Sequence, residues 1–190
     1  MPNIFNESRF IFYQLLRPFS YLQIQHRDRH IYNWIVPLVA SILTMIFILV
    51  FIDIKDAVRE GGLIDSINNF VANLPGFFIA ALAAVATFNK NDIDLEMNND
   101  VKLTILYQGS STDIPLTRRR FLCVLFSYLT ATSLFLVLFT KLALASSWHE
   151  SWYPAVSWIG CWLFFFILWQ MLLATVLGLY YLGERLHTAE

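Results

Sequence analysis

The sequence predicts an all-α membrane protein with four transmembrane helices. This prediction rests on four long apolar stretches, at residues 34–52, 70–88, 121–139 and 158–182, with charged residues almost entirely between them. Each stretch is long enough to cross a bilayer, since a hydrocarbon core of about 30 Å needs about 20 helical residues. The composition agrees, because 57% of the residues are hydrophobic and 14% are charged, against about 25% charged in soluble domains.

The same stretches argue against a membrane β-barrel. They lack the alternation of lipid-facing and lumen-facing residues that barrel strands show. A helix also satisfies its backbone amides and carbonyls within its own segment, whereas each unpaired group in lipid is costly.

The positions of lysine and arginine predict the orientation. Ten of the 13 lie in the segments 1–33, 89–120 and 183–190, and the other three lie in the connections on the opposite side. Positive charge in short loops favours the cytoplasm, so we expect these three segments to face the cytoplasm. The segments 34–88 and 121–182 are expected to hold two spans each. No apolar core precedes residue 34, so the first span is expected to act as the targeting signal, without a cleavable signal peptide.

Residues 1–33 are predicted to form a basic, amphipathic collar. Residues 6–16 have the pattern of a short helix that ends before a proline. This helix could lie in the lipid headgroups or pack on the cytoplasmic ends of the spans, and the sequence leaves both open. Arg27, Arg29 and His30 follow beside the membrane. His26 and His30 offer two ligands where a zinc site needs three or four, so we expect no metal site.

The second span differs from the others because small residues recur at every fourth position. These residues are Ala72, Gly76, Ala80 and Ala84. Small residues at this spacing let helix backbones approach closely. We therefore expect the second span to be the buried helix and this stripe to be a helix-packing face, within one subunit or between subunits. The connection before it, residues 53–65, mixes both charge signs with two glycines and is predicted to be a solvated turn.

The 89–120 loop is the largest predicted soluble piece. Its acidic start includes Asp92, Asp94 and Glu96. Residues 101–107 then have the pattern of a strand, 108–113 of a turn and 114–116 of a returning strand. We expect a small cytoplasmic β-hairpin between the second and third helices.

Three consecutive arginines, Arg118, Arg119 and Arg120, open the third span. They either anchor the topology or form a patch for a partner or for lipid. Thr117, directly before them, has a side chain suited to cap the third helix.

Four further side chains in and near the last two spans carry expectations. Lys141 lies just past the third span and is expected to snorkel to the outer interface. Gln170 is a lone amide in the fourth span, and we expect it to bond between helices. Cys123 and Cys161 are predicted to lie near opposite faces of the membrane, too far apart for a disulfide, so we expect both to be free.

The sequence offers no sign of catalysis. The four apolar cores contain no Asp, Glu, Lys, Arg or His, although intramembrane enzymes and transporters usually keep such residues for function. Metalloprotease, serine hydrolase and phosphate-loop motifs are also absent from the sequence. We therefore predict a protein that is not an enzyme and binds no cofactor.

The layout resembles the membrane subunits of the Kiwa antiphage defence systems, the KwaA family. The most recognisable segment is IPLTRRRFLCVLFSYL at residues 114–129, where the third span is entered. The basic aromatic collar, the four spans and the central hairpin extend the resemblance along the chain. It implies an inner-membrane sensor that assembles as a homo-oligomer, with a tetramer as the candidate assembly, and works with the soluble cytoplasmic DNA-binding protein KwaB.

We expect a non-catalytic sensor and scaffold that docks this effector on its cytoplasmic face. Charge clusters of opposite sign on one face suit electrostatically guided docking. The candidate docking residues are Arg27, Arg29, His30, Asp92, Asp94, Glu96, Arg118, Arg119 and Arg120. The alternative is an oligomeric pore that depolarises the membrane. A lipid-modifying enzyme is disfavoured, since no nucleophile or general base stands out at the interface, and we expect no direct contact of this chain with nucleic acid.

Overall fold

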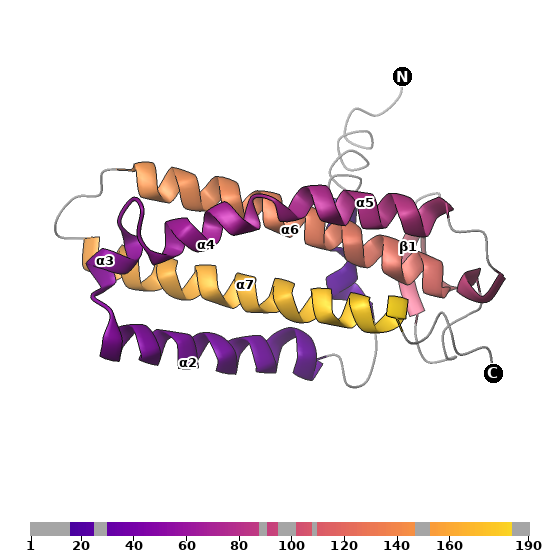
Figure 1. The fold of residues 1–190 in the computed structure, drawn as a ribbon. Coiled ribbons are helices and arrows are strands. Elements are labelled where there is room, and N and C mark those ends of the chain that lie inside the picture. The colour runs from indigo at the N-terminus through magenta and orange to yellow at the C-terminus, as the bar shows by residue number, and fades with distance from the viewer. Residues whose placement is uncertain are drawn as a thin grey trace, which may run out of the picture.

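The computed structural model of the chain describes residues 16–24, 30–87, 91–94, 102–107, 110–146 and 153–183. Within these residues, four helical segments are long and apolar enough to cross a membrane. They run beside one another as a bundle (Figure 1). The prediction of a multi-pass membrane protein with four such helices is confirmed.

The first two segments are joined from shorter helices. Segment one combines a turn of π-helix, η2 (Ile31–Ile35), with α2 (Val36–Phe51). Segment two contains α3 (Ile54–Val58), α4 (Leu63–Val71) and α5 (Leu74–Thr87).

The last two segments are each one continuous helix. They are α6 (Arg118–Ala145) and α7 (Tyr153–Gly183). Both begin before the apolar stretch that predicted them, and they are the longest helices described. Two 3-10 turns, η1 (Arg17–Gln23) and η3 (Asn91–Asp94), lie outside the four segments.

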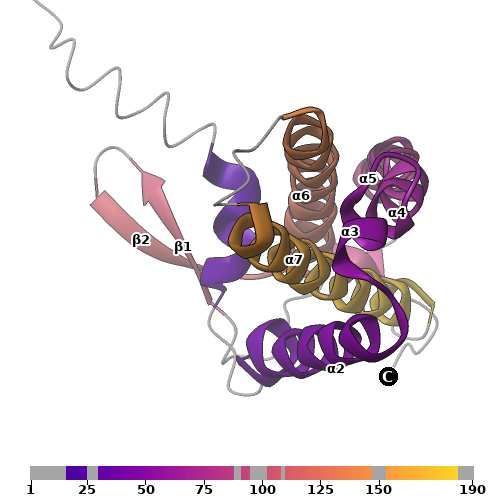
Figure 2. The same cartoon turned by 90° about the vertical axis from the view of Figure 1, so that its left-hand side faces the viewer.

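The order of packing places α7 and α6 in the middle of the bundle. α5 packs on α6, α6 packs on α7, and α7 packs on α2, and the end-on view shows this arrangement (Figure 2). Half of the most apolar window of the third segment is buried, against 22% for the second. The expectation that the second span is the buried helix is therefore wrong, because α6 takes that place.

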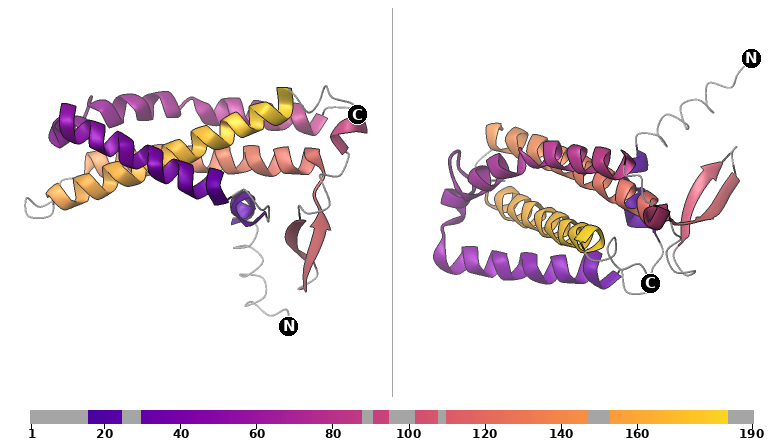
Figure 3. Two further views of the ribbon diagram at one scale, coloured as in Figure 1. Left: turned by 90° about the horizontal axis from the view of Figure 1, so that it is seen from below. Right: turned by 45° about the vertical axis from the view of Figure 1, so that its right-hand side comes forward.

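Two strands lie within the predicted 89–120 loop. β1 (Lys102–Tyr107) pairs with β2 (Ser110–Pro115) in an antiparallel register that places Lys102 opposite Pro115 and Tyr107 opposite Ser110. They project from the end of the bundle where α6 begins (Figure 3).

The connection at residues 53–65 is not the solvated turn that the sequence predicted. It forms α3 and the start of α4, and Ala57, Ile64 and Asp65 are buried. Asp53 caps α3 by accepting a hydrogen bond from the backbone N–H of Lys55 at 3.0 Å. The reversal between the two helices occurs at Gly61, whose φ of 74° is a left-handed conformation that glycine adopts without strain.

Candidate functional site

The residues that were predicted to dock a partner and that the structure describes gather at one end of the bundle. This is the end at which α2 and α6 begin and α5 finishes, and β1 and β2 extend beyond it (Figures 1 and 3). The aspartate of η3 and the arginines of α6 meet there. It is the candidate docking face.

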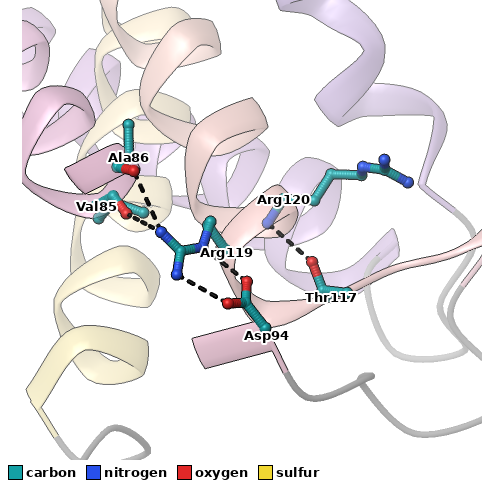
Figure 4. A network of polar contacts seen from close by, with 6 residues as sticks. All are labelled: Val85, Ala86, Asp94, Thr117, Arg119 and Arg120. Carbon is teal, nitrogen blue, oxygen red and sulfur yellow. Dashed lines mark hydrogen bonds and ion pairs between the residues drawn. The ribbon is translucent and has the colours of Figure 1, made fainter. Parts of the chain in front are cut away.

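Arg119 and Asp94 pair with each other at this face (Figure 4). Arg119 Nε donates to Asp94 Oδ1 at 2.7 Å, and its Nη2 donates to Asp94 Oδ2 at 2.9 Å. Arg119 Nη1 also donates to the backbone carbonyls of Ala86 at 3.2 Å and Val85 at 3.4 Å. The guanidinium thus ties η3 and α6 to the last turn of α5, where backbone carbonyls have no partner within the helix.

This pairing changes the electrostatics of the face. The two hydrogen bonds from Arg119, followed by its positive charge, hold the pKa of Asp94 below its ordinary value of 3.8. A lowered carboxyl pKa stabilises the folded state at pH values above that ordinary value, and the contribution is lost as the pH falls through the folded-state pKa. The pair therefore persists at neutral pH, and two residues predicted to dock a partner largely neutralise each other.

Arg120 and His30 are exposed and lie at the same end. The Arg120 side chain points away from the Arg119 network (Figure 4). Its backbone N–H donates to Thr117 Oγ1 at 3.3 Å, which confirms Thr117 as the cap of α6. Arg118 is half-buried beside it.

The other predicted docking residues are not described. Arg27, Arg29, Glu96 and the side chain of Asp92 lie outside the described part of the structure, as does the predicted N-terminal helix except for Leu16.

A chain of buried hydrogen bonds connects this end to the middle of the bundle. Tyr21 Oη of η1 donates to Asn33 Oδ1 of η2 at 3.2 Å, and Gln170 Nε2 of α7 donates to the Asn33 backbone carbonyl at 3.0 Å. Tyr128 Oη of α6 donates to Gln170 Oε1 at 3.0 Å. All four residues are buried. The expectation that Gln170 bonds between helices is confirmed. The sequence did not predict that Tyr21 and Asn33 take part in this hydrogen-bond chain.

Aromatic packing holds η1 against α6 beside these hydrogen bonds. The Tyr21 and Tyr128 rings stack with centroids 4.9 Å apart. The Phe19 ring meets the Tyr128 ring edge to face, with centroids 6.1 Å apart, and its centroid lies 5.9 Å from that of the Phe135 ring. Aromatic pairs at such separations add about 0.5–1.5 kcal/mol each beyond the area that they bury. The segment that leads into the first span is therefore fixed to the third.

At the opposite end of the bundle, Lys141 pairs with Asp65. Lys141 Nζ donates to Asp65 Oδ1 at 2.6 Å, and the Gly61 N–H donates to Asp65 Oδ2 at 3.0 Å. The Asp65 side chain is 11% exposed and that of Lys141 is 49% exposed. The prediction that Lys141 simply snorkels is therefore incomplete, because its charge also joins α4 to α6.

The small-residue stripe of the second span faces away from its own subunit. All four members are exposed: Ala72, Gly76, Ala80 and Ala84. The buried face of α5 is formed by Pro75, Phe78 and Val85. A Cβ added at Gly76 would meet no atom within 4 Å. The described residues of the same subunit therefore leave this stripe exposed.

The described residues provide no metal centre, since no three His, Cys, Asp or Glu side chains in them come together. Cys123 and Cys161 are both free thiols, as predicted. No protein-family model matches the chain, and searches of curated proteins and of solved structures found no match.

Proposed function

We propose that this chain is a non-catalytic sensor and scaffold of the bacterial inner membrane, of the KwaA type, which docks a soluble KwaB-type effector. The observation that carries the proposal is the buried hydrogen-bond chain from Tyr21 through Asn33 to Gln170 and Tyr128. It joins the N-terminal segment to the two central helices. A shift of α6 against α7 must therefore move or release η1, which suits a protein that transmits a membrane event to one face.

The orientation proposed is the one that places this face in the cytoplasm. It is supported by the ten-to-three division of lysine and arginine. In a variant lacking Cys123 and Cys161, a cysteine at Glu60 should react in cells with a membrane-impermeant maleimide admitted through the outer envelope. A cysteine at Ser110 should react only after the inner membrane is opened. The opposite labelling pattern would show that the chain has the inverse orientation in the membrane.

Docking is proposed to use the charged side chains that form no ion pair within the described residues. Arg120 and His30 are exposed at the face, whereas Asp94 and Arg119 hold each other. Reversing Asp94 would also disturb the end of α5, because Arg119 bonds to its carbonyls. Arg120 is therefore the sharper site for a test.

We expect Arg120→Glu to weaken co-purification of a co-expressed KwaB-type effector several-fold. Reversing an interface charge opposes the partner's complementary charge, and raised salt should partly mimic the loss. Lys55→Glu is the matched control, since Lys55 is an exposed cation at the opposite end. Membrane insertion of both variants should equal that of the wild type.

Undiminished co-purification of Arg120→Glu, and of a variant with Arg27 and Arg29 neutralised, would rule out charge-guided docking. The pore alternative would then be tested by ion flux in liposomes that contain this chain alone. Ion flux without any partner would favour the pore over the scaffold.

We further propose that the chain works as a homo-oligomer, with a tetramer as the candidate assembly by resemblance. The outward-facing stripe on the second segment supports this, because small residues let helices of neighbouring subunits approach closely.

A further inference from the structure

A groove of about 670 Å³ lies between α6 and α7. Its lining side chains lie between residues 128 and 146, on α6 and its C-cap, and between residues 156 and 170 of α7, with further side chains from η1 and from the connection around α3. Its volume is within the range of about 300–1,000 Å³ that ligand pockets occupy. The hydrogen-bond chain described above occupies only one end of this groove.

The groove is at least as long as one leaflet of a bilayer. Its lining runs from Tyr128 to Ser146 on one side, eighteen steps or about 27 Å, and from Val156 to Gln170 on the other, fourteen steps or about 21 Å. A bilayer with its headgroups is about 40–45 Å thick, so one leaflet measures about 20–22 Å. The groove therefore begins at a membrane surface and finishes near the bilayer centre.

The two ends of the groove differ in chemistry. Near the bilayer centre, Phe19 and Leu22 of η1 line it together with Tyr128 and Gln170. At the surface end, the lining includes Arg59 and Glu60, both exposed. Between these ends the walls are mainly apolar, with Phe139 and Phe164 among their side chains.

The shape and lining of the groove suit an extended apolar chain. About 670 Å³ is spread along at least about 21 Å of two helices, and the walls are mainly apolar. An extended hydrocarbon chain matches both.

We propose that this groove binds one acyl chain of a zwitterionic phospholipid, with phosphatidylethanolamine as the best match. The chain lies between α6 and α7 and ends against η1. The headgroup carries one phosphate and one ammonium, which complement the adjacent charges of Arg59 and Glu60. Asp56 pairs with Arg59 at 3.3 Å and adds a second carboxylate beside Glu60. An anionic lipid would meet these two carboxylates and has no ammonium to compensate their charge. This inference does not depend on the proposed function.

The test uses two glycines of the same helix. Gly160 lines the groove, Gly183 does not, and a Cβ added at either would meet no atom within 4 Å. The full-length protein is exchanged into detergent with dioleoylphosphatidylethanolamine or dioleoylphosphatidylglycerol, and retained lipid is counted by native mass spectrometry. We expect wild type and Gly183→Phe to retain one phosphatidylethanolamine per chain, and Gly160→Phe to lose most of it.

Equal lipid retention by Gly160→Phe and wild type would overturn the site, and so would a wild type that retains no lipid. Loss of oligomer mass in Gly160→Phe without loss of lipid would assign the groove to a second copy instead. Equal retention of the two lipids, or a preference that survives Arg59→Gln combined with Glu60→Gln, would overturn the headgroup assignment. If Gly160→Phe yields little folded protein, Ala143→Phe on the facing wall replaces it, and the same loss of retained lipid is expected.

Discussion

Replacing Gln170 by leucine is expected to destabilise the protein by about 1–3 kcal/mol. The substitution removes the acceptor of the Tyr128 hydroxyl and the donor to the Asn33 carbonyl, and it leaves both groups buried. Measured hydrogen bonds between membrane helices average only about 0.6 kcal/mol. The larger value is expected here because one side chain serves two buried partners at once.

Thermal unfolding in detergent measures this effect, with the folded fraction at each temperature determined by size-exclusion chromatography. Thr175→Val is the matched control, since the Thr175 hydroxyl donates to the Met171 carbonyl of its own helix at 2.8 Å and bonds to no second element in the described part of the chain. A double-mutant cycle with Tyr128→Phe should give a positive coupling energy. Equal losses from Gln170→Leu and Thr175→Val would mean that the network adds nothing to stability.

Gly76→Leu is expected to lower the mass of the assembled protein without unfolding its subunits. Within one chain the new side chain meets open space, because nothing lies within 4 Å of a Cβ at this position. In a close-packed interface between subunits it would collide, and such overpacking costs about 1–3 kcal/mol. An effect on mass therefore reports contact with another molecule.

Light scattering of the detergent-solubilised protein measures the mass. Gly183→Leu is the control, because that glycine also faces open space and lies at the end of a different helix. An unchanged mass for Gly76→Leu would assign the stripe to lipid and would leave the homo-oligomer without a known interface.

The sequence predicted the number of spanning helices because apolar length is a local property. It also predicted the Thr117 cap and the part played by Gln170, since an isolated polar group in lipid must find a partner nearby. The ion pair between Asp65 and Lys141 could not be predicted in this way. Its partners are 76 positions apart, and no local pattern places α4 beside α6.

The direction of the small-residue stripe was also beyond the sequence. The four-residue spacing shows that Ala72, Gly76, Ala80 and Ala84 share a face. In a soluble helix the apolar face points to the core, but in a membrane lipid is as apolar as the protein interior. Composition therefore cannot tell an inward face from an outward one, and the contacts of Phe78 and Val85 decide it.

The unequal lengths of the four segments have a mechanical consequence. Ile31–Phe51 has 21 residues and Arg118–Ala145 has 28, which correspond to rises of about 31 Å and about 42 Å. The first matches a hydrocarbon thickness of about 30 Å, whereas the second must tilt or emerge from it. Local thinning or stretching of the bilayer would thus act unequally on α2 and on α6. Hydrophobic mismatch is a force that can shear one helix of this bundle against another without any bound ligand.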